Sequence, residues 1–580
     1  MDKAQKLPGS DVLLSCLEKS GVELLLGYTG GAIMPTFDAL QRFPNLRFIT
    51  SRHEQGAGFI AGGYTRACGK LAPVMVTSGP GATNLITAVA DSKMDSVPML
   101  AITGQVNTEV IGTDAFQESD IVGIMYPCTK FASMPLSSDE LALTIGQSIY
   151  IATHGRPGPV CIDLPKNVQQ ELTNNIEIPE DLDLPGFELP NLPKKADLEI
   201  AAKIINKAKR PVILAGHGII LSQSQNELQT IMEKTQIPAA FTVHGLSSIP
   251  ASNALNLGMM GMHGEIEANR AIQNADVLIA LGMRFDDRVT GKISEFGKNQ
   301  KIIHVEVDPS EIGKNVAVDA SINADLKETL IELEKLIEVK TTEDRLEFFQ
   351  TIEENKLISR DAYSRVFKKG YGQNNRLLMA RVVHELSEFT NGNDNVVSDV
   401  GQHQMFTAKF YKFERFNTWF NSGGLGTMGF SLPTAIGVKL ARPDEEVWSI
   451  NGDGGFQMNI QELGTIKQEN LNINILILNN EYLGMVKQWQ DLFYKKNYAQ
   501  TELINPDFEH IAKAYGLAYK KVEKVEEIIP ALEWSKFQTG STIVEFLCDK
   551  SELVFPMIST SMSYDQMILH EEDARSRVKE

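Results

Sequence analysis

Short apolar runs recur along the chain, and most of them stop at glycine, aspartate or asparagine. Residues 74–76 (VMV), 211–215 (PVILA) and 447–450 (VWSI) are examples, and each is followed by a stretch with helical periodicity. Short runs rich in β-branched residues, alternating with helices, are typical of buried parallel strands. The pattern therefore predicts an α/β protein built on parallel sheets.

Two polar stretches divide this pattern into three blocks. The segment 176–195 is rich in proline and acidic residues, which favours a linker over a helix or a central strand. A charged run from about Glu332 to Lys369 is predicted to be helical and to lead into the last block. Because 580 residues are too many for one hydrophobic core, we expect three domains, at 1–180, 190–345 and 370–580.

Composition and charge argue against several classes of function. The net charge of −19, without a basic block, argues against nucleic acid or anionic lipid as a partner. No apolar run reaches the roughly 18 residues that a membrane span needs, and the first residues lack the apolar core of a signal peptide. We expect a cytoplasmic protein whose cysteines are reduced thiols, since their spacing fits no metal site. They are Cys16, Cys68, Cys128, Cys161 and Cys548.

Two strand ends in the last block carry candidate chemistry. One apolar run stops at NGDGG (451–455), and another, about one βαβ unit later, stops at NN (479–480). Because parallel strands end at the same edge of a sheet, Asp453 and Asn480 are expected to lie together. Each alone reads as an ordinary turn. Together, glycines that admit a phosphate and hard oxygen donors predict a site for Mg²⁺ and a diphosphate.

A second candidate is a carboxylate in the first block. Glu54 follows the strand-like run 46–50 (LRFIT) and opens a helix of small residues. Taken alone, a glutamate at a helix N-terminus is simply favoured by the helix dipole. In combination with the nearby SGPGATN segment (78–84), we interpret Glu54 as a functional group in a position to be buried.

The GDG and NN pair resembles the diphosphate motif of thiamine diphosphate enzymes, and Glu54 resembles the carboxylate that they hold against the cofactor's pyrimidine ring. Nearly the whole chain is similar to one subfamily, the catalytic subunits of acetohydroxyacid synthase (acetolactate synthase). RFDDRVTG resembles the FAD-binding segment of the biosynthetic type, which the FAD-free catabolic enzymes lack. The matching motifs are GGAIMP (30–35), RHEQGA (52–57), VTSGPGATN (76–84), GTDAFQE (112–118), GRPGPV (155–160), GMHG (261–264), RFDDRVTG (284–291), DVGQHQMF (399–406), NSGGLGTMGF (421–430), GDGGFQMNIQEL (452–463) and GMVKQWQ (484–490).

The resemblance implies three domains, each a mostly parallel sheet flanked by helices: a pyrimidine-binding domain, a Rossmann-like FAD domain and a diphosphate-binding domain. It implies thiamine diphosphate, Mg²⁺ and FAD as cofactors. Thiamine diphosphate would contact Tyr28, Gly31, Glu54, Asn84, Val400, Gln402, His403, Gly426, Met428, Gly452, Asp453, Gly454, Gly455 and Asn480. Asp453, Asn480 and the main-chain oxygen of Tyr482 would hold Mg²⁺. FAD would contact Arg156, Gly216, Gly218, Thr242, Met262, His263, Gly282, Arg284, Asp286, Arg288, Glu306 and Asp325.

The implied activity is decarboxylation of pyruvate, followed by transfer of the two-carbon unit to a second pyruvate or to 2-oxobutanoate. The products, 2-acetolactate and 2-aceto-2-hydroxybutanoate, lead to valine, leucine and isoleucine. By resemblance, Arg288 binds the acceptor's carboxylate, a role that its planar guanidinium suits. Trp489 would form an apolar wall that distinguishes ethyl from methyl side chains. The catalytic set is completed by Glu54, Gln117 and Lys166, the last two at the site entrance.

The resemblance also implies partners. The family's active site lies between two subunits, so a homodimer or larger homo-oligomer with shared sites is expected. A small regulatory subunit is expected as well.

Four positions depart from the family pattern. Thr29 and Asn107 stand where prolines are usual, His217 interrupts a glycine run, and the tail after Pro556 lacks a usual glycine. These departures leave open a related thiamine diphosphate decarboxylase or carboligase with another acceptor. A subunit that binds the cofactor and only regulates is disfavoured by the presence of Glu54, Asp453 and Asn480.

Overall fold

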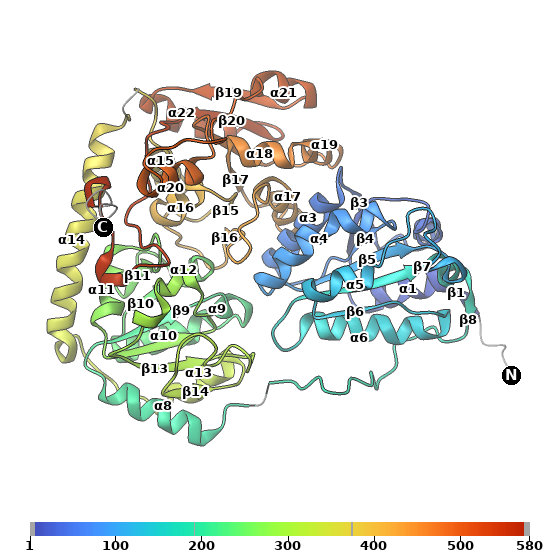
Figure 1. Ribbon diagram of the computed structural model, residues 1–580, viewed down its shortest axis with the longest axis horizontal. Coiled ribbons are helices and arrows are strands. Elements are labelled where there is room, and N and C mark those ends of the chain that lie inside the picture. The colour runs from blue at the N-terminus through green and yellow to red at the C-terminus, as the bar shows by residue number, and fades with distance from the viewer. Residues whose placement is uncertain (1–5, 191, 373–374, 574–580) are drawn as a thin grey trace.

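The computed structural model describes residues 6–190, 192–372 and 375–573, and it contains three six-stranded parallel sheets (Figure 1). The prediction of an α/β protein with three parallel-sheet domains is confirmed. Each predicted strand run ends where a glycine or a polar residue allows the chain to turn into a helix. In the described part of the chain, no helix combines the length and the apolar character that crossing a membrane requires.

The N-terminal sheet has the order β3-β2-β4-β5-β7-β6. A short antiparallel pair, β1 (Leu7–Pro8) and β8 (Leu172–Thr173), brings the start and the end of this domain together. The sheet strands are β2 (Leu24–Gly27), β3 (Arg47–Thr50), β4 (Val74–Val76), β5 (Met99–Gln105), β6 (Phe131–Ser133) and β7 (Pro159–Pro165). The helices are α1 (Gly9–Lys19), α2 (Met34–Ala39), α3 (Glu54–Cys68), α4 (Pro80–Met94), α5 (Ile121–Met125), α6 (Leu141–Thr153) and α7 (Lys166–Gln170).

The central sheet has the order β11-β10-β9-β12-β13-β14. Between Thr173 and Lys195 the described residues form neither helix nor strand, as expected for the proline-rich segment. The strands are β9 (Pro211–Ala215), β10 (Ala239–Phe241), β11 (Asn256–Met259), β12 (Val277–Leu281), β13 (Lys301–Val305) and β14 (Ala320–Ile322). The helices are α8 (Lys195–Lys207), α9 (Gly218–Leu221), α10 (Gln225–Thr235), α11 (Ile266–Asn274), α12 (Asp287–Thr290) and α13 (Leu326–Glu334).

The prediction of one helical run from Glu332 to Lys369 is wrong in its first third. Helix α13 ends at Glu334, and α14 (Leu346–Lys369) begins after a break. The break contains Thr341 and Thr342 followed by Asp344, whose carboxylate accepts hydrogen bonds from the Thr341 backbone and hydroxyl. Such local side-chain bonds compete with helix formation. In Figure 1, α14 runs along one edge of the molecule from the central domain to the C-terminal domain.

The C-terminal sheet has the order β16-β15-β17-β18-β20-β19. Strands β17 and β18 are parallel neighbours, so the ends carrying Asp453 and Asn480 meet at one edge, as predicted. The strands are β15 (Asn395–Ser398), β16 (Trp419–Phe420), β17 (Val447–Gly452), β18 (Asn474–Asn479), β19 (Ala518–Val522) and β20 (Thr542–Leu547). The helices are α15 (Met379–Thr390), α16 (Gln402–Phe410), α17 (Ser431–Ala441), α18 (Asp453–Met458), α19 (Leu463–Gln468), α20 (Gly484–Phe493), α21 (Phe508–Tyr515) and α22 (Ile528–Lys536).

Helices α3 and α17 join the N-terminal and C-terminal domains. Phe59 of α3 packs edge-on against Phe430, with ring centroids 5.4 Å apart, inside a core to which both domains contribute. The backbones approach so closely that a Cβ on Gly63 would lie 2.3 Å from the oxygen of Thr434. A Cβ on Gly437 would lie 2.0 Å from the oxygen of Ile60. Glycine is therefore required on both helices.

Adjacent glycines in α3 allow a matched test of this contact. Gly63→Ala should lower the apparent melting temperature, because the new methyl meets backbone and overpacking of this kind costs about 1–3 kcal/mol. Gly62→Ala is the control: its Cβ would have only Ser92 Oγ nearby, at 4.0 Å. Alanine is favoured over glycine inside a helix by roughly 0.5–1 kcal/mol, so this variant should melt at or above the wild-type temperature. Equal effects in scanning calorimetry would contradict the close contact.

Candidate active site

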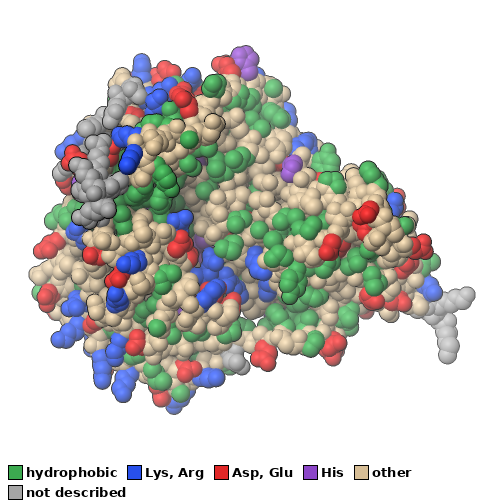
Figure 2. All heavy atoms as spheres, viewed as in Figure 1, with side chains coloured by type: hydrophobic (Ala, Val, Ile, Leu, Met, Phe, Trp, Pro, Cys, Tyr) green, Lys and Arg blue, Asp and Glu red, His purple; other side chains and the backbone are tan. Residues whose placement is uncertain are grey.

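A cavity of about 1050 Å³ lies where the three domains meet. In Figure 2, basic side chains gather near the middle of the visible face, where the N-terminal domain adjoins the other two. All the predicted FAD contacts except Gly216 line the cavity. From the predicted thiamine diphosphate, metal and substrate sets it is lined by Val400, Gln402, His403, Gly426, Met428, Gly452, Asp453, Gly454, Gly455, Asn480, Tyr482, Arg288 and Trp489.

The C-terminal domain contributes the wall with Asp453 and Asn480. Asp453 is the first residue of α18, and Asn480 directly follows β18. Burial raises the pKa of Asp453 to about 6, while a hydrogen bond from Asn505 opposes the rise. The Asn480 side-chain oxygen accepts from the backbone N–H of Tyr482, at 3.2 Å. The two predicted ligands and the Tyr482 turn are thus brought together.

His403 lies between two glycines on the same wall. A Cβ on Gly452 would lie 2.8 Å from the imidazole, and one on Gly401 would lie 2.9 Å from it. Burial lowers the pKa of His403 to about 3, so the ring is neutral at physiological pH. Among the described residues its buried Nε2 atom has no hydrogen-bond partner. His403 is one of the residues that line the cavity, and a buried polar atom without a partner is a candidate to bind a ligand.

The loop that carries Met428 is held by a buried carboxylate. Asp399 accepts hydrogen bonds from the backbone N–H groups of Val400, at 2.7 Å, and Gly429, at 2.9 Å. Burial raises the pKa of Asp399 to about 7. Asp399 opens the DVGQHQMF motif, but its role could not be predicted from the sequence. Its backbone bonds fix the position of the residue that follows Met428.

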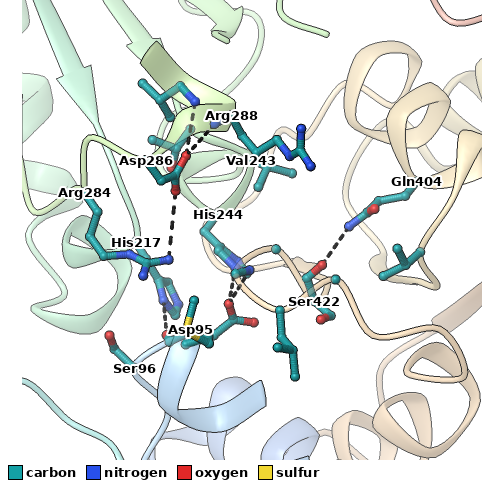
Figure 3. A pocket seen from close by; sticks show the side chains of 18 of the residues that line it. Asp95, Ser96, His217, Val243, His244, Arg284, Asp286, Arg288, Gln404 and Ser422 are labelled. Carbon is teal, nitrogen blue, oxygen red and sulfur yellow. Dashed lines mark hydrogen bonds and ion pairs between the residues drawn. The ribbon is translucent and has the colours of Figure 1, made fainter. Parts of the chain in front are cut away.

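The central domain contributes the opposite wall. Asp286 caps α12 by accepting from the backbone N–H groups of Arg288 and Val289. The guanidinium of Arg288 lies 3.6 Å from the sulfur of Met262. Arg284 lies 3.9 Å from Asp286, and Figure 3 shows the two side chains pointing toward each other. Gly216 is packed instead against Gly282, whose oxygen would lie 2.4 Å from a Cβ on Gly216.

A cluster of charged residues joins the three domains at the base of the cavity (Figure 3). The Asp95 carboxylate, from the N-terminal domain, lies 2.9 Å from His244 Nε2 of the central domain. It also accepts from the backbone N–H of Gly424 in the C-terminal domain, at 2.7 Å, and pairs with Arg66. His217, whose Nδ1 lies 2.9 Å from the Asp95 carbonyl oxygen, stacks on His244. This junction was missed from sequence because its members lie far apart in the chain.

Asp91 extends the junction from the preceding turn of α4. Its carboxylate pairs with Arg66 and accepts hydrogen bonds from the hydroxyls of Ser422 and Thr427. Together Asp91 and Asp95 therefore hold both ends of the segment 422–427, which leads into Met428. The only sequence signal was two aspartates four residues apart on the helix after SGPGATN, and such a pair has many ordinary explanations.

The other predicted residues gather at the carboxyl edge of the N-terminal sheet, outside the cavity. Tyr28 and Gly31 follow β2, and Lys166 follows β7. Asn84 donates a hydrogen bond to Glu54 at 3.0 Å. The backbone of Gln117 packs on Gly79, so close that a Cβ there would lie 2.7 Å from the Gln117 oxygen. The candidate residues of one chain therefore form two separate groups. One group lies at this sheet edge, and the other lines the cavity.

Three family models match successive parts of the chain. They are described as the N-terminal TPP binding domain (residues 7–124), the central domain (198–333) and the C-terminal TPP binding domain (399–546) of thiamine pyrophosphate enzymes. The central match contains all of β9 to β14, the N-terminal match contains β2 to β5, and the C-terminal match contains β16 to β19. The C-terminal match also contains Asp453 and Asn480. The fold and the site therefore define a thiamine pyrophosphate enzyme.

Relatives narrow this class. The chain is 40% identical to an acetolactate synthase of Mycobacterium leprae, over 97% of this chain and 90% of the relative. It is 40% identical to the acetolactate synthase large subunit of Corynebacterium glutamicum, over 96% and 90%. It is 42% identical to the chloroplastic acetolactate synthase 2 of Nicotiana tabacum, over 98% and 86%. The chain belongs to the acetolactate synthase family.

The two aspartates at the junction of the three domains, Asp91 and Asp95, should contribute unequally to the stability of the folded protein. Burial favours the protonated acid, but His244 and Arg66 outweigh it and hold the pKa of Asp95 below its ordinary value. The stabilisation from ionised Asp95 is thus fully present above the unfolded-state pKa of about 3.9, and is lost only as the pH falls towards the lower native value. At pH 7.5, Asp95→Asn should destabilise the protein by about 3–5 kcal/mol, as for other broken buried pairs.

Asp91→Asn is the matched control for this prediction. Burial and the charge of Asp95 raise the pKa of Asp91 to about 6. The ionised form, which predominates at pH 7.5, is therefore less favourable in the folded protein than in the unfolded chain. An amide at position 91 can still accept from Ser422 and Thr427. Asp91→Asn should therefore lower the apparent melting temperature much less than Asp95→Asn. A larger loss for Asp91→Asn would contradict the assigned charges.

Proposed function

We propose that the chain is a catalytic large subunit that decarboxylates pyruvate and joins the remaining two-carbon unit to a second 2-oxoacid. One C–C bond breaks with release of CO₂, and one forms to the acceptor's carbonyl carbon, whose oxygen becomes a hydroxyl. Pyruvate as acceptor gives 2-acetolactate, and 2-oxobutanoate gives 2-aceto-2-hydroxybutanoate. The observation that carries this proposal is the pair Asp453 and Asn480 on a cavity that Arg288 and Trp489 also line. This is a transferase activity of branched-chain amino acid biosynthesis.

The residues of the C-terminal wall fit thiamine diphosphate and Mg²⁺. Among the described residues, no group of three or more His, Cys, Asp or Glu is placed to hold a metal ion. A hard cation bound here would rely on one carboxylate, the Asn480 amide oxygen, the Tyr482 main-chain oxygen and a ligand diphosphate, a set that suits Mg²⁺. The unpartnered His403 Nε2 is available to a diphosphate oxygen. When bound, thiamine diphosphate supplies the electron sink that decarboxylation requires.

The central wall fits FAD. Arg284 and Arg288 of the central domain line the cavity together with Arg156 of the N-terminal domain. Arg156 pairs with Asp308 and Glu311, which leaves Arg284 and Arg288 to neutralise a dinucleotide's diphosphate. Glu306 accepts from the backbone N–H groups of Val307 and Asp308, and burial raises its pKa to about 7. Because the proposed reaction involves no net oxidation or reduction, FAD would serve as a structural group.

The acceptor would lie between Arg288 and Trp489. The guanidinium of Arg288 is exposed beside Met262 and can form two parallel hydrogen bonds to the acceptor's carboxylate. Trp489 packs on Phe493 with ring centroids 5.0 Å apart, which orients the indole as an apolar wall. Contact with the extra methylene of 2-oxobutanoate is worth about 1–3 kcal/mol of discrimination.

Glu54 supports an assembly in which two chains share each site. Its carboxylate, held by Asn84, lies at the edge that no part of its own chain's cavity reaches. We propose that Glu54, with Tyr28, Gly31, Gln117 and Lys166, completes the cavity of a second copy in a homodimer or larger oligomer. There Glu54 would hold a proton against the cofactor's pyrimidine nitrogen.

The proposal also covers the domain limits of the chain and a partner subunit. Domain limits at 1–180, 190–345 and 370–580 place each sheet in one domain, although 1–5, 191, 373–374 and 574–580 lie outside the described residues. A small regulatory subunit is proposed as a partner, since the C. glutamicum relative is called a large subunit.

Product analysis tests the activity. Purified protein given pyruvate and 2-oxobutanoate, with thiamine diphosphate, Mg²⁺ and FAD, should form both acetohydroxyacids, which mass spectrometry distinguishes. Omission of FAD from stripped protein should abolish both products, because the central wall would then lose its ligand. Release of acetaldehyde with no acetohydroxyacid would instead favour a related thiamine diphosphate decarboxylase.

Substitution of Glu54 should impair one step, the activation of bound thiamine diphosphate. Glu54→Gln should slow exchange of the thiazolium C2 proton of bound thiamine diphosphate by at least 100-fold, because an amide cannot share the required proton with the pyrimidine nitrogen. The rate is measured by NMR after quenching in deuterium oxide. Binding of thiamine diphosphate, followed by calorimetry, should change much less. Unchanged exchange would remove Glu54 from the proposed active site.

A further inference from the structure

Asn505 makes a contact with Asp453 that the proposed function does not use. It lies in the connection between α20 and α21, 52 residues beyond Asp453. Its side-chain Nδ2 atom donates to Asp453 Oδ2 at 2.7 Å and to Asn479 Oδ1 at 3.0 Å. Asn505 therefore joins the ends of β17 and β18, the two strands that carry the proposed cation ligands.

The orientation of this amide is fixed by a neighbour on α18. Gln457 Nε2 donates to Asn505 Oδ1 at 2.9 Å and to the Asp453 carbonyl oxygen at 2.9 Å. The Asp453 carbonyl oxygen can only accept, so the side-chain nitrogen of Gln457 must face it. The same nitrogen then needs the oxygen of Asn505 as its second acceptor, which turns the Asn505 NH₂ group toward the carboxylate. Asp453 thus receives a neutral donor on one of its two oxygens.

The backbone around Asn505 supports the third proposed ligand. Leu483 N–H donates to the Thr501 oxygen at 2.8 Å, and Leu503 N–H donates to the Glu481 oxygen at 2.8 Å. An antiparallel bridge joins Tyr482 and Glu502. The segment 501–505 therefore pairs with the turn whose main-chain oxygen, at Tyr482, is proposed to face the cation.

We propose that Asn505 is a positioning residue for the divalent cation and, through it, for the cofactor's diphosphate. This inference rests on the proposed Mg²⁺ site. Asn505 holds Oδ2 of Asp453 with a neutral donor, so it adds no second charge that would compete with the cation. Mg²⁺ requires near-ideal octahedral geometry, so a carboxylate free to rotate is a poorer ligand. Groups that orient a ligand in this way typically change metal affinity by about 10–100-fold.

The position of Asn505 makes it suitable for substitution. Its side chain is only partly buried, and the neighbouring Ile504 is fully exposed at 101%. The backbone bonds of the segment 501–505 do not involve the Asn505 side chain. Asn505→Ala should therefore fold, and its melting temperature in excess chelator should match that of the wild type.

The test is calorimetric titration of Mg²⁺ into protein with saturating thiamine diphosphate. Asn505→Ala should bind Mg²⁺ about 10–100-fold more weakly. Gln457→Ala, which frees the Asn505 amide to rotate, should show a smaller loss. Asn497→Ala is the matched control, an exposed asparagine in the same connection, and should leave the affinity unchanged. Asp453→Ala, which removes the ligand itself, should show the largest loss.

A second cation separates positioning from a general effect on the loop. Ca²⁺ accepts irregular coordination, so Asn505→Ala should weaken Ca²⁺ binding less than Mg²⁺ binding. An equal loss for both cations would overturn the inference, and so would unchanged Mg²⁺ affinity in Asn505→Ala when Asp453→Ala loses it. Unchanged affinity in Asp453→Ala would instead show that the proposed Mg²⁺ site is wrong.

Discussion

The backbone contact between α3 and α17 is the constraint on which the cavity depends. Gly63 and Gly437 let the two helices touch, so the N-terminal and C-terminal sheets share one apolar core. The segment before α17 is thereby brought against α4, where Asp91 and Asp95 hold it. Met428 lies between that segment and α17, so its place in the cavity wall depends on how closely α3 and α17 pack.

Sequence reasoning succeeded where a local rule carries the information. Strand ends in a parallel sheet meet at one edge, and this rule alone predicts that Asp453 and Asn480 lie together. It failed where the partner is set by tertiary approach. Nothing in the segment around Asn505 marks it as a neighbour of Asp453, and nothing links Asp95 with His244. The helix expected across 335–345 was missed because Asp344 bonds to the local backbone, a choice that charge periodicity does not reveal.

Net charge carried no information about the cavity. The chain has a net charge of −19, yet Arg156, Arg284 and Arg288 line the space between its domains. An anionic ligand responds to the potential inside the cavity, where surrounding apolar walls weaken screening. His217, which stands where a glycine is usual in the family's pattern, adds an imidazole stacked on His244 to the same wall.

The two covalent connections between domains differ in kind, and this difference affects how the molecule assembles. Helix α14 is a stiff connection between the central and C-terminal domains, whereas the described residues between Thr173 and Lys195 form no helix or strand. The described part of this segment packs on the N-terminal core through Ile176, Ile178, Leu184 and Phe187. A covalent connection of this kind raises the effective concentration of one domain at the other. The docking of the N-terminal domain on α17 is thereby an intramolecular event.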